Sequence, residues 1–438
     1  MMELTRSLEI QDKFHSIIPG GSHTYAKGDD QYPEQYPLYI DRGKGCHVWD
    51  LDGNKFIEYG MGLRAVTLGH AYEPVNEAVR RQLELGNNFV RPALLELECA
   101  EELLSCISGA EMVKFGKNGS DVTDGAIRLS RAYTGRDLIA VCENHPFFSV
   151  NDWFIGTTPM NSGIPKAIQD LTVKFRYDDI QSVRDLFETY PNQVAALIME
   201  PDKGTDPKDN FLHETKKLCE LNGAVFIFDE MITGFRWHLG GGQAYHGVIP
   251  DLSTFGKGIA NGFSVSALLG KKEIMELGGI RHDRERVFLL SLTHGAEGHC
   301  LAAAQQTIRT YKQEPVIETL WNRGRRLAEG IQRSIEEHHL DGYFTVSGKP
   351  SCLVYGTCDQ DKKPSQKFRT LFLQETIKRG ILAPSLILSY SHTDDVIDQT
   401  VEIIHEALAV YRKALDEGVE KYLKSRPVQP VWRLYNNI

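Results

Sequence analysis

The sequence lacks the features that would assign it to a membrane, to nucleic acid or to an oxidising compartment. No run approaches the roughly 18 apolar residues of a membrane-spanning helix, and the first residues have no signal-peptide core. The formal net charge is −10, so no overall basic field attracts nucleic acid or anionic lipid. The eight cysteines form no Cys-x-x-Cys pair and no metal-binding spacing with histidine. We therefore expect a reduced, cytoplasmic protein without a structural metal.

The 438 residues suit one large domain and a smaller one. Near the N-terminus, residues 45–49 and 55–59 read as strands joined by a turn at Asp52-Gly53, which predicts a hairpin. From about residue 72, helical patterns alternate with short apolar runs. The runs at 194–199 and 224–228 are uninterrupted, which is typical of strands buried on both faces of a mainly parallel sheet.

A crossover helix is predicted between these two runs, at residues 211–222, and completes a βαβ unit. Glu200 follows the first run and Asp229 follows the second. Ligands of open α/β sheets bind beyond the carboxyl ends of the strands, so both side chains face the expected site. After about residue 325, short strands at 343–346 and 351–355 indicate a separate small sheet.

Lys257 stands between two glycines, where the backbone can approach a ligand closely. A lysine that forms a Schiff base needs an unprotonated amine in a crowded, partly desolvated pocket, and this context can provide it. Asp229 ends a buried strand, and catalysis by pyridoxal phosphate (PLP) needs a carboxylate against the pyridine nitrogen. A surface lysine and a helix-capping aspartate explain each residue equally well on its own. Only the combination with other motifs decides.

Two further segments have the composition of ligand-binding turns. Residues 115–121 form a glycine-containing turn that leads into an amphipathic helix, with Ser120 as the predicted cap. Free backbone amides at such a helix start can hold a phosphate group, although the turn matches neither the P-loop nor the dinucleotide fingerprint. Residues 291–299 carry hydroxyls and two histidines ahead of an alanine-rich helix. By itself, that segment favours a polar turn before a buried helix.

In this order and spacing, the elements resemble the class III aminotransferases of PLP fold type I, and most of all the glutamate-1-semialdehyde aminomutases. The resemblance spans nearly the whole chain. It implies an α/β fold with a large PLP-binding domain at 71–325, in which a mainly parallel seven-stranded sheet lies between helices. Residues 1–70 and 326–438 would form a smaller α+β domain. The motifs that carry the resemblance are IPGG (18–21), VWDLDGN (48–54), LGHA (68–71), DEMITGFR (229–236), PDLSTFGK (250–257) and SHTD (391–394).

The resemblance assigns catalytic and phosphate-binding roles to matching positions. Lys257 would carry PLP as a Schiff base and move the proton at the substrate carbon, and Asp229 would pair with the pyridine nitrogen. Gly119 and Ser120 would hold the phosphate. Thr293 of the partner subunit would complete the phosphate site, which implies a homodimer with shared active sites.

The predicted surroundings of the ring depart from the family pattern. Met231 would lie under the ring, where relatives usually have valine, and Glu200 would lie near it. The family's Tyr-His-Gly has no literal copy here. With one inserted residue, Phe147 falls on the aromatic position, and phenylalanine can stack on the ring but lacks the tyrosine hydroxyl. His145 stays open as the alternative stacking residue.

The substrate side departs further from the aminomutases. Lys27, in the same segment as Thr24, stands where the aminomutases bind the substrate carboxylate with arginine. A lysine offers a point charge instead of a planar fork. Arg64 adds a positive charge in a stretch that differs from the aminomutase sequence. Ile387 or Leu388 stands where the aminomutases have a glutamate in the substrate pocket.

We therefore expect a PLP-dependent aminotransferase that moves an amino group from an amino-acid donor to a ketone or aldehyde acceptor. The altered carboxylate site points to a sugar-like or phosphorylated acceptor. The alternative is a glutamate-1-semialdehyde 2,1-aminomutase of tetrapyrrole synthesis, which the motifs support and the substrate-side replacements oppose. A homologue without turnover is a third hypothesis, which the retention of both Lys257 and Asp229 opposes.

Overall fold

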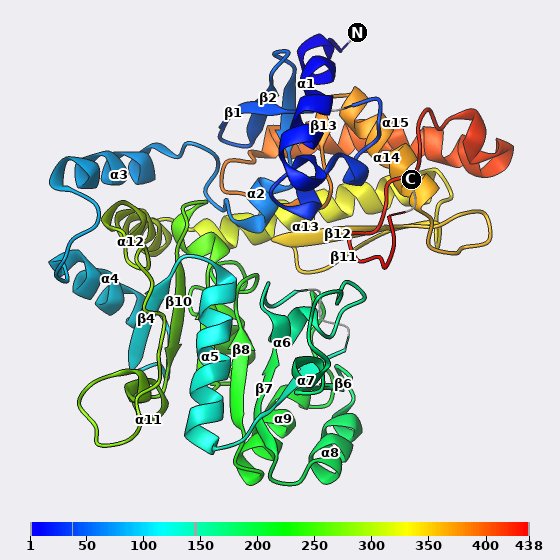
Figure 1. The fold of residues 1–438 in the computed structure, drawn as a ribbon. Helices are drawn as coiled ribbons and strands as arrows, with labels where there is room; N and C mark the ends of the chain where they lie inside the picture. Colours follow the sequence, from blue (N-terminus) through cyan, green and yellow to red (C-terminus); the bar gives the residue numbers. More distant parts are fainter. Residues whose placement is uncertain (1, 37, 144–146, 437–438) are drawn as a thin grey trace. The chain divides into compact units, whose positions relative to one another are not determined.

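The computed structural model describes residues 2–36, 38–143 and 147–436 (Figure 1). The chain forms two compact units: the first comprises residues 1–72 and 318–433, and the second comprises residues 73–317 and 434–438. The domain boundaries predicted after residues 70 and 325 stay predictions, because the compactness of a unit does not show that it folds by itself. Among the described residues, no helix is both long enough and apolar enough to cross a membrane.

The second unit is built on a seven-stranded sheet with the order β4-β10-β9-β8-β7-β5-β6. The strands from β5 to β9 pair in parallel, whereas β10 runs antiparallel to both of its neighbours. The prediction of a mainly parallel seven-stranded sheet is therefore confirmed. The strands are β4 (Met112–Gly116), β5 (Leu138–Cys142), β6 (Thr172–Phe175), β7 (Val194–Met199), β8 (Val225–Asp229), β9 (Leu252–Phe255) and β10 (Ser266–Gly270).

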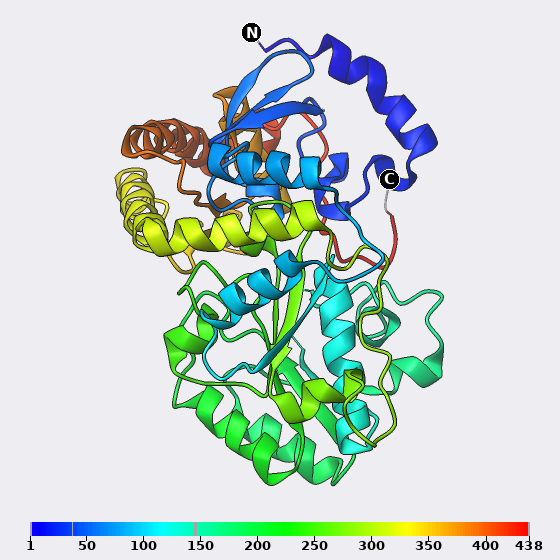
Figure 2. The same cartoon turned by 90° about the vertical axis from the view of Figure 1, so that its left-hand side faces the viewer.

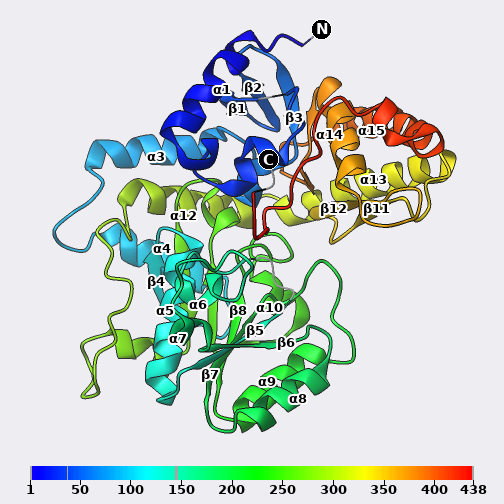
Figure 3. The ribbon, with the colours of Figure 1, turned by 45° about the vertical axis from the view of Figure 1, so that its right-hand side comes forward.

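Helices cover both faces of this sheet, which explains why every residue of β7 and β8 is buried. Figure 3 shows α5 (Gly119–Thr134) on one side of the strands and α8 (Ile180–Thr189) with α9 (Phe211–Leu221) on the other. The predicted crossover helix is α9. The other helices of this unit are α3 (Glu73–Leu85), α4 (Leu94–Leu104), α6 (Asp152–Ile155), α7 (Lys166–Gln169), α10 (Gly241–His246), α11 (Lys272–Met275), α12 (Gly298–Gln313) and the short 3-10 helices η4 (Lys257–Ala260) and η5 (Glu276–Gly278).

The first unit joins the two ends of the chain in one sheet, of order β1-β2-β3-β13. Its strands are β1 (Ile40–Lys44), β2 (His47–Asp50), β3 (Lys55–Glu58) and β13 (Ile381–Leu382). The antiparallel pair of β2 and β3 is the predicted hairpin, and β13 adds to β3 in parallel. In Figure 2 the blue N-terminal elements and the orange and red C-terminal elements of this unit lie side by side.

A second sheet of the first unit has the order β11-β12-β14, with β11 (Phe344–Ser347), β12 (Cys352–Thr357) and β14 (Leu386–Ile387). Its first two strands are those predicted at 343–346 and 351–355. The helices are α1 (Thr5–Ile17), α2 (Met61–Arg64), α13 (Val316–Glu337, which begins in the second unit), α14 (Gln366–Lys378), α15 (Asp394–Glu417) and the 3-10 helices η1 (Pro19–Gly21), η2 (Tyr25–Lys27), η3 (Asp29–Gln31) and η6 (Val419–Lys421).

Candidate active site

Asp229 is the last residue of β8 and is 2% exposed. Its Oδ1 accepts the backbone N–H of Met231 at 2.9 Å and the hydroxyl of Thr254, on the neighbouring β9, at 3.3 Å. Burial raises the pKa of this carboxyl from 3.8 to about 6, and the positive charge of Lys257 acts in the opposite direction. The carboxylate and the lysine therefore act on one another electrostatically at the carboxyl edge of the sheet.

Lys257 opens η4 directly after β9, with a φ of +43°. Residues with a side chain adopt this left-handed region rarely, and such strain collects at functional sites. The preceding Gly256 is needed for a different reason. A Cβ at Gly256 would lie 2.6 Å from Sδ of Met231, so a larger residue there would force this methionine side chain to move.

Met231 is buried and contacts a second glycine, Gly119, where a Cβ would lie 3.1 Å from the same Sδ. Three segments that are far apart in sequence thus meet around one methionine: the start of α5, the end of β8 and the turn that carries Lys257. The structure brings Gly119, Asp229, Met231 and Lys257 together at this edge of the sheet, and their roles toward a cofactor stay a prediction.

The prediction that Ser120 caps α5 is wrong. The cap is Asn118, two residues earlier, and the helix begins at Gly119, because the Asp121 carboxylate reaches back and accepts the N–H groups of Lys117 (3.0 Å) and Asn118 (2.8 Å). The Ser120 hydroxyl instead accepts the backbone N–H of Val150 at 3.0 Å. Ser120 stays at the first turn of the helix, where amide groups and the helix dipole favour a phosphate.

The remaining predicted residues of this unit lie in varied surroundings. Glu200 is buried directly after β7. Phe147 is 46% exposed and contacts Phe154 edge-on, with 5.8 Å between the ring centres. Thr293 is exposed, and its carbonyl accepts the side-chain N–H of Asn88 at 3.0 Å. His145 lies outside the described residues.

The predicted substrate residues all belong to the first unit. Thr24 and Lys27 are exposed around η2, and Arg64 is the half-buried last residue of α2. Their part in substrate binding stays a prediction.

Glu230, beside Asp229, has a structural role that sequence reasoning missed. Its fully buried carboxylate accepts the N–H groups of Gly242 and Gln243 at 2.7 Å each, together with the hydroxyl of Thr233. Burial raises the pKa of Glu230 to about 7. The Asp-Glu pair at a strand end was the signal for it, because a buried strand cannot end in two carboxylates unless both have partners. Glu230 therefore ties the start of α10 to the end of β8.

A second network, on Asp202, also escaped the sequence analysis. Its buried carboxylate accepts Nε1–H of Trp237 at 2.6 Å and lies 2.7 Å from Nε2 of His246. Asp202, Asp206 and His246 carry ligand atoms close enough to group around a metal ion. The two N–H partners of Asp202 already use that carboxylate, so its position suits a hydrogen-bond network that holds α10 in place.

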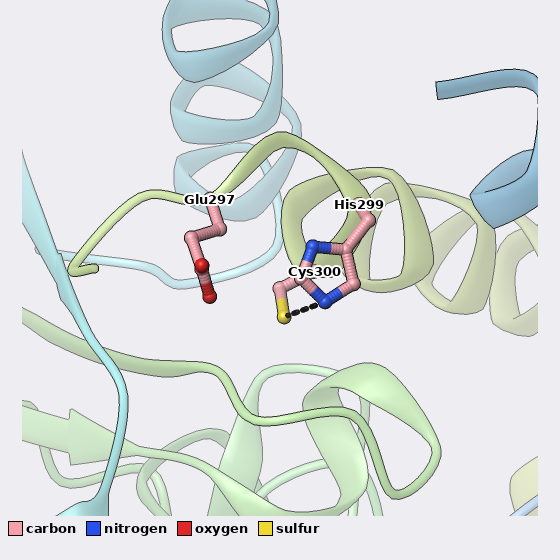
Figure 4. Close-up of side chains that lie close together, drawn as sticks. All are labelled: Glu297, His299 and Cys300. Atoms are coloured by element: carbon pink, nitrogen blue, oxygen red, sulfur yellow. Dashed lines mark hydrogen bonds between the residues drawn. The ribbon is translucent and has the colours of Figure 1, made fainter. Parts of the chain in front are cut away.

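Glu297, His299 and Cys300 form another group with metal-ligand chemistry at the start of α12 (Figure 4). Sγ of Cys300 lies 3.2 Å from Nε2 of His299. The ammonium of Lys117, however, forms an ion pair with Glu297 and lies 3.3 Å from the same sulfur. The lysine charge occupies the position that a metal cation would take, so these donors fit an ion-pair network better than a metal.

Comparison with known proteins identifies the family. The sequence model of the family described as "Aminotransferase class-III" matches residues 28–408. The chain belongs to the class III aminotransferases. The family predicted from the sequence is confirmed, and so are an enzyme of this family and PLP as its cofactor.

Curated relatives match the chain over nearly its full length. A 3-aminobutyryl-CoA aminotransferase of Cloacimonas acidaminovorans is 30% identical, over 94% of this chain and 99% of the relative. Glutamate-1-semialdehyde 2,1-aminomutases are as similar: that of Archaeoglobus fulgidus is 30% identical over 93% of this chain and 100% of its own. That of Hyperthermus butylicus is 32% identical over 92% and 98%.

Solved structures confirm the predicted PLP fold type I. The PLP form of the FumI protein of Sphingopyxis sp. MTA144 superposes with a TM-score of 0.87 at 25% identity, over 97% of this chain and 99% of that one. An omega-transaminase of Sphaerobacter thermophilus gives a TM-score of 0.82 at 26% identity, over 94% and 100%. The similarity thus includes both aminotransferases and aminomutases.

Proposed function

We propose that this class III aminotransferase moves an amino group from an amino-acid donor to a ketone or aldehyde acceptor, with Lys257 and Asp229 as catalytic residues. The observation that carries the proposal is the electrostatic pair of a strained lysine and a buried carboxylate at the carboxyl edge of the sheet. The same edge holds Gly119 and Met231 in contact. Amino transfer on PLP needs a lysine and a carboxylate of this kind. The aminotransferase and the aminomutases among the relatives are both named for chemistry of this kind.

The residues at this edge fit PLP. When bound, PLP supplies an electron-withdrawing ring that accepts an amino group and gives it up again. Asp229 would hold a proton at the ring nitrogen, because a buried carboxylate with a raised pKa is stabilised by a cationic N–H partner. Met231 would support the ring from below. Gly119 and Ser120 would bind the phosphate with the first amides of α5.

Lys257 would hold the cofactor at rest through its Nζ and then carry a proton to and from the substrate carbon. Lys257 has a left-handed backbone conformation. The preceding Gly256 keeps this turn of the chain close to Met231. Glu200 would lie near the ring. The open face of Phe147 suits stacking on the ring, and His145 stays the alternative.

Three further assignments are proposals of the same kind. Thr24, Lys27 and Arg64 would bind an anionic group of the substrate, such as a carboxylate or a phosphate. Thr293 of the partner subunit would complete the phosphate site, so we propose a homodimer. All eight cysteines are free thiols, which suits a reducing, cytoplasmic location.

The second candidate is a glutamate-1-semialdehyde 2,1-aminomutase, because relatives of that name are as similar as the aminotransferase. The two differ in their need for an amino donor. We would titrate the purified holoenzyme with single amino-acid donors and follow the visible absorbance of its cofactor, with Lys257→Ala as control. Loss of the visible band with one donor, followed by its return with a carbonyl acceptor, supports the aminotransferase.

Turnover of glutamate semialdehyde without any added donor would favour the aminomutase. A wild-type protein that does not acquire a lysine-linked visible band, or a Lys257→Ala variant that keeps it, would contradict both candidates. The band therefore tests the shared chemistry, and donor dependence tests the choice between the two.

A further inference from the structure

The first unit contains a cavity of about 620 Å³, which is within the usual size range of small-molecule sites. It is lined by residues of α1, of the segments 21–36 and 38–40, of the hairpin of β2 and β3, and of the segments 60–63, 70 and 382–384, all within the first unit. Most of the wall is apolar or aromatic. Phe14 and Tyr39, for example, lie with their ring centres 4.4 Å apart.

One wall carries a buried carboxylate. The side chain of Glu58 is 10% exposed, and its Oε2 lies 3.0 Å from Nε2 of His70. Among the described residues, no donor forms a hydrogen bond with its other oxygen, Oε1. That oxygen lies against Gly60, where a Cβ would stand 2.5 Å away, so glycine leaves room for the carboxylate beside the cavity.

The charges around the cavity favour a positively charged ligand. Three carboxylates line it, those of Asp29, Glu34 and Glu58, against a single lysine, Lys27. Asp29 is already bound by Gln11 at 3.0 Å and by His15 at 2.9 Å. The buried Glu58 is therefore the carboxylate that a ligand inside the cavity would meet.

The aromatic side chains of the cavity also favour a positively charged ligand. The cavity is lined by Phe14, Tyr32, Tyr36 and Tyr39. Ring faces attract cations, and the rest of each ring contacts apolar carbon. A ligand with one ammonium group and an apolar body matches both parts of the wall.

We propose that this cavity binds an apolar primary amine, whose ammonium donates a hydrogen bond to Oε1 of Glu58 and whose carbon chain lies against Phe14 and Tyr39. The site lies entirely in the first unit. Lys27, one of the proposed substrate residues, also lines this cavity. The proposal does not rest on amino transfer, because binding is measured on an enzyme whose cofactor cannot react.

The test is isothermal titration of the full-length holoenzyme with n-hexylamine, hexan-1-ol and hexanoate. Borohydride reduction beforehand fixes the cofactor to the protein, so that the amine cannot react there. We expect hexylamine to bind, hexan-1-ol to bind more weakly and hexanoate not to bind. The charge-assisted hydrogen bond predicts that Glu58→Gln weakens hexylamine by about tenfold or more. Glu34→Gln, at an exposed carboxylate of the same cavity, is the matched control and leaves the affinity within about twofold.

Phe14→Ala provides a second measurement that leaves the Glu58–His70 pair intact, in case Glu58→Gln unfolds. It is expected to weaken hexylamine and hexan-1-ol by similar factors, because it removes apolar contact only. Equal hexylamine affinity in the wild type and both variants would overturn the proposal and leave Glu58 as a structural partner of His70. Preferential binding of hexanoate, lost in Lys27→Met, would overturn it as well.

Discussion

A carboxylate buried at the end of a strand is unfavourable unless a positive charge faces it, and Asp229 is such a carboxylate. The rise of its pKa from 3.8 to about 6, caused by burial, corresponds to about 3 kcal/mol of unfavourable free energy for the ionised form at neutral pH. Lys257 offsets part of the burial effect. The cofactor-free protein therefore holds a charge that the bound ring nitrogen would stabilise.

Asp229→Asn should change activity and stability in opposite directions. We expect kcat to fall by about 10²–10⁴, because asparagine cannot keep the ring nitrogen protonated. The cofactor-free variant should be more stable than wild type by up to about 3 kcal/mol at pH 7.5, since the neutral amide avoids the buried charge. The pKa of Asp229 is higher in the folded protein than in the unfolded chain, so the carboxylate becomes protonated in the folded protein as the pH falls from 6 toward 4. The stability difference between variant and wild type therefore shrinks over this range. Urea denaturation at pH 7.5 and pH 5 measures it, and a variant less stable than wild type at both values would contradict the argument.

Gly256→Ala tests whether Met231 sets the position of the lysine turn. The backbone at Gly256 is extended, with a φ of −174°, so alanine meets only the steric obstacle of the methionine sulfur at 2.6 Å. We expect Gly256→Ala to lower PLP affinity at least about tenfold in the wild-type background but to have little further effect in a Met231→Ala background, where the sulfur is absent. Fluorescence titration of cofactor-free protein with PLP measures both. An equal fall in both backgrounds would rule out the proposed contact.

The two buried carboxylate oxygens of Glu230 join the end of β8 to the first turn of α10. Glu230→Ala leaves the N–H groups of Gly242 and Gln243 buried without an acceptor, at about 1–3 kcal/mol each. We expect the free energy of unfolding to fall by about 2–6 kcal/mol in urea denaturation. Glu220→Ala, at a surface carboxylate of α9, should change it by less than about 0.5 kcal/mol. Equal effects of the two substitutions would mean that Glu230 does not anchor α10.

The elements that the sequence predicts well are those with a local signal. The apolar runs of β7 and β8 and the glycines beside Lys257 can be read without knowing any partner. Thr254 could not be found in this way, because it meets Asp229 only through the pairing of β8 with β9. The start of α5 was misplaced by two residues because a serine looked like the cap, whereas Asp121 reaches back to the amides before it.

At the scale of the whole molecule, the second unit exposes apolar side chains that a monomer has no reason to expose. They cluster in residues 83–97 around the fully exposed Val90, with Leu292 nearby in the wall of a shared cavity that also includes Thr293. Large exposed apolar patches mark interaction surfaces. The predicted homodimer would bury this face and would place Thr293 where a second subunit is present.

We therefore expect the variant Phe89→Asp/Val90→Asp to be monomeric in light scattering coupled to size exclusion, because two buried charges without partners disfavour an interface. Since Thr293 of the partner subunit is proposed to bind the phosphate, the same variant should also bind PLP at least about tenfold more weakly. Leu221→Asp, at an exposed leucine of α9, is the control and should change neither property. A monomeric variant with wild-type PLP affinity would keep the dimer but remove Thr293 from the phosphate site. A dimer that persists in the double variant would place the interface elsewhere on the protein.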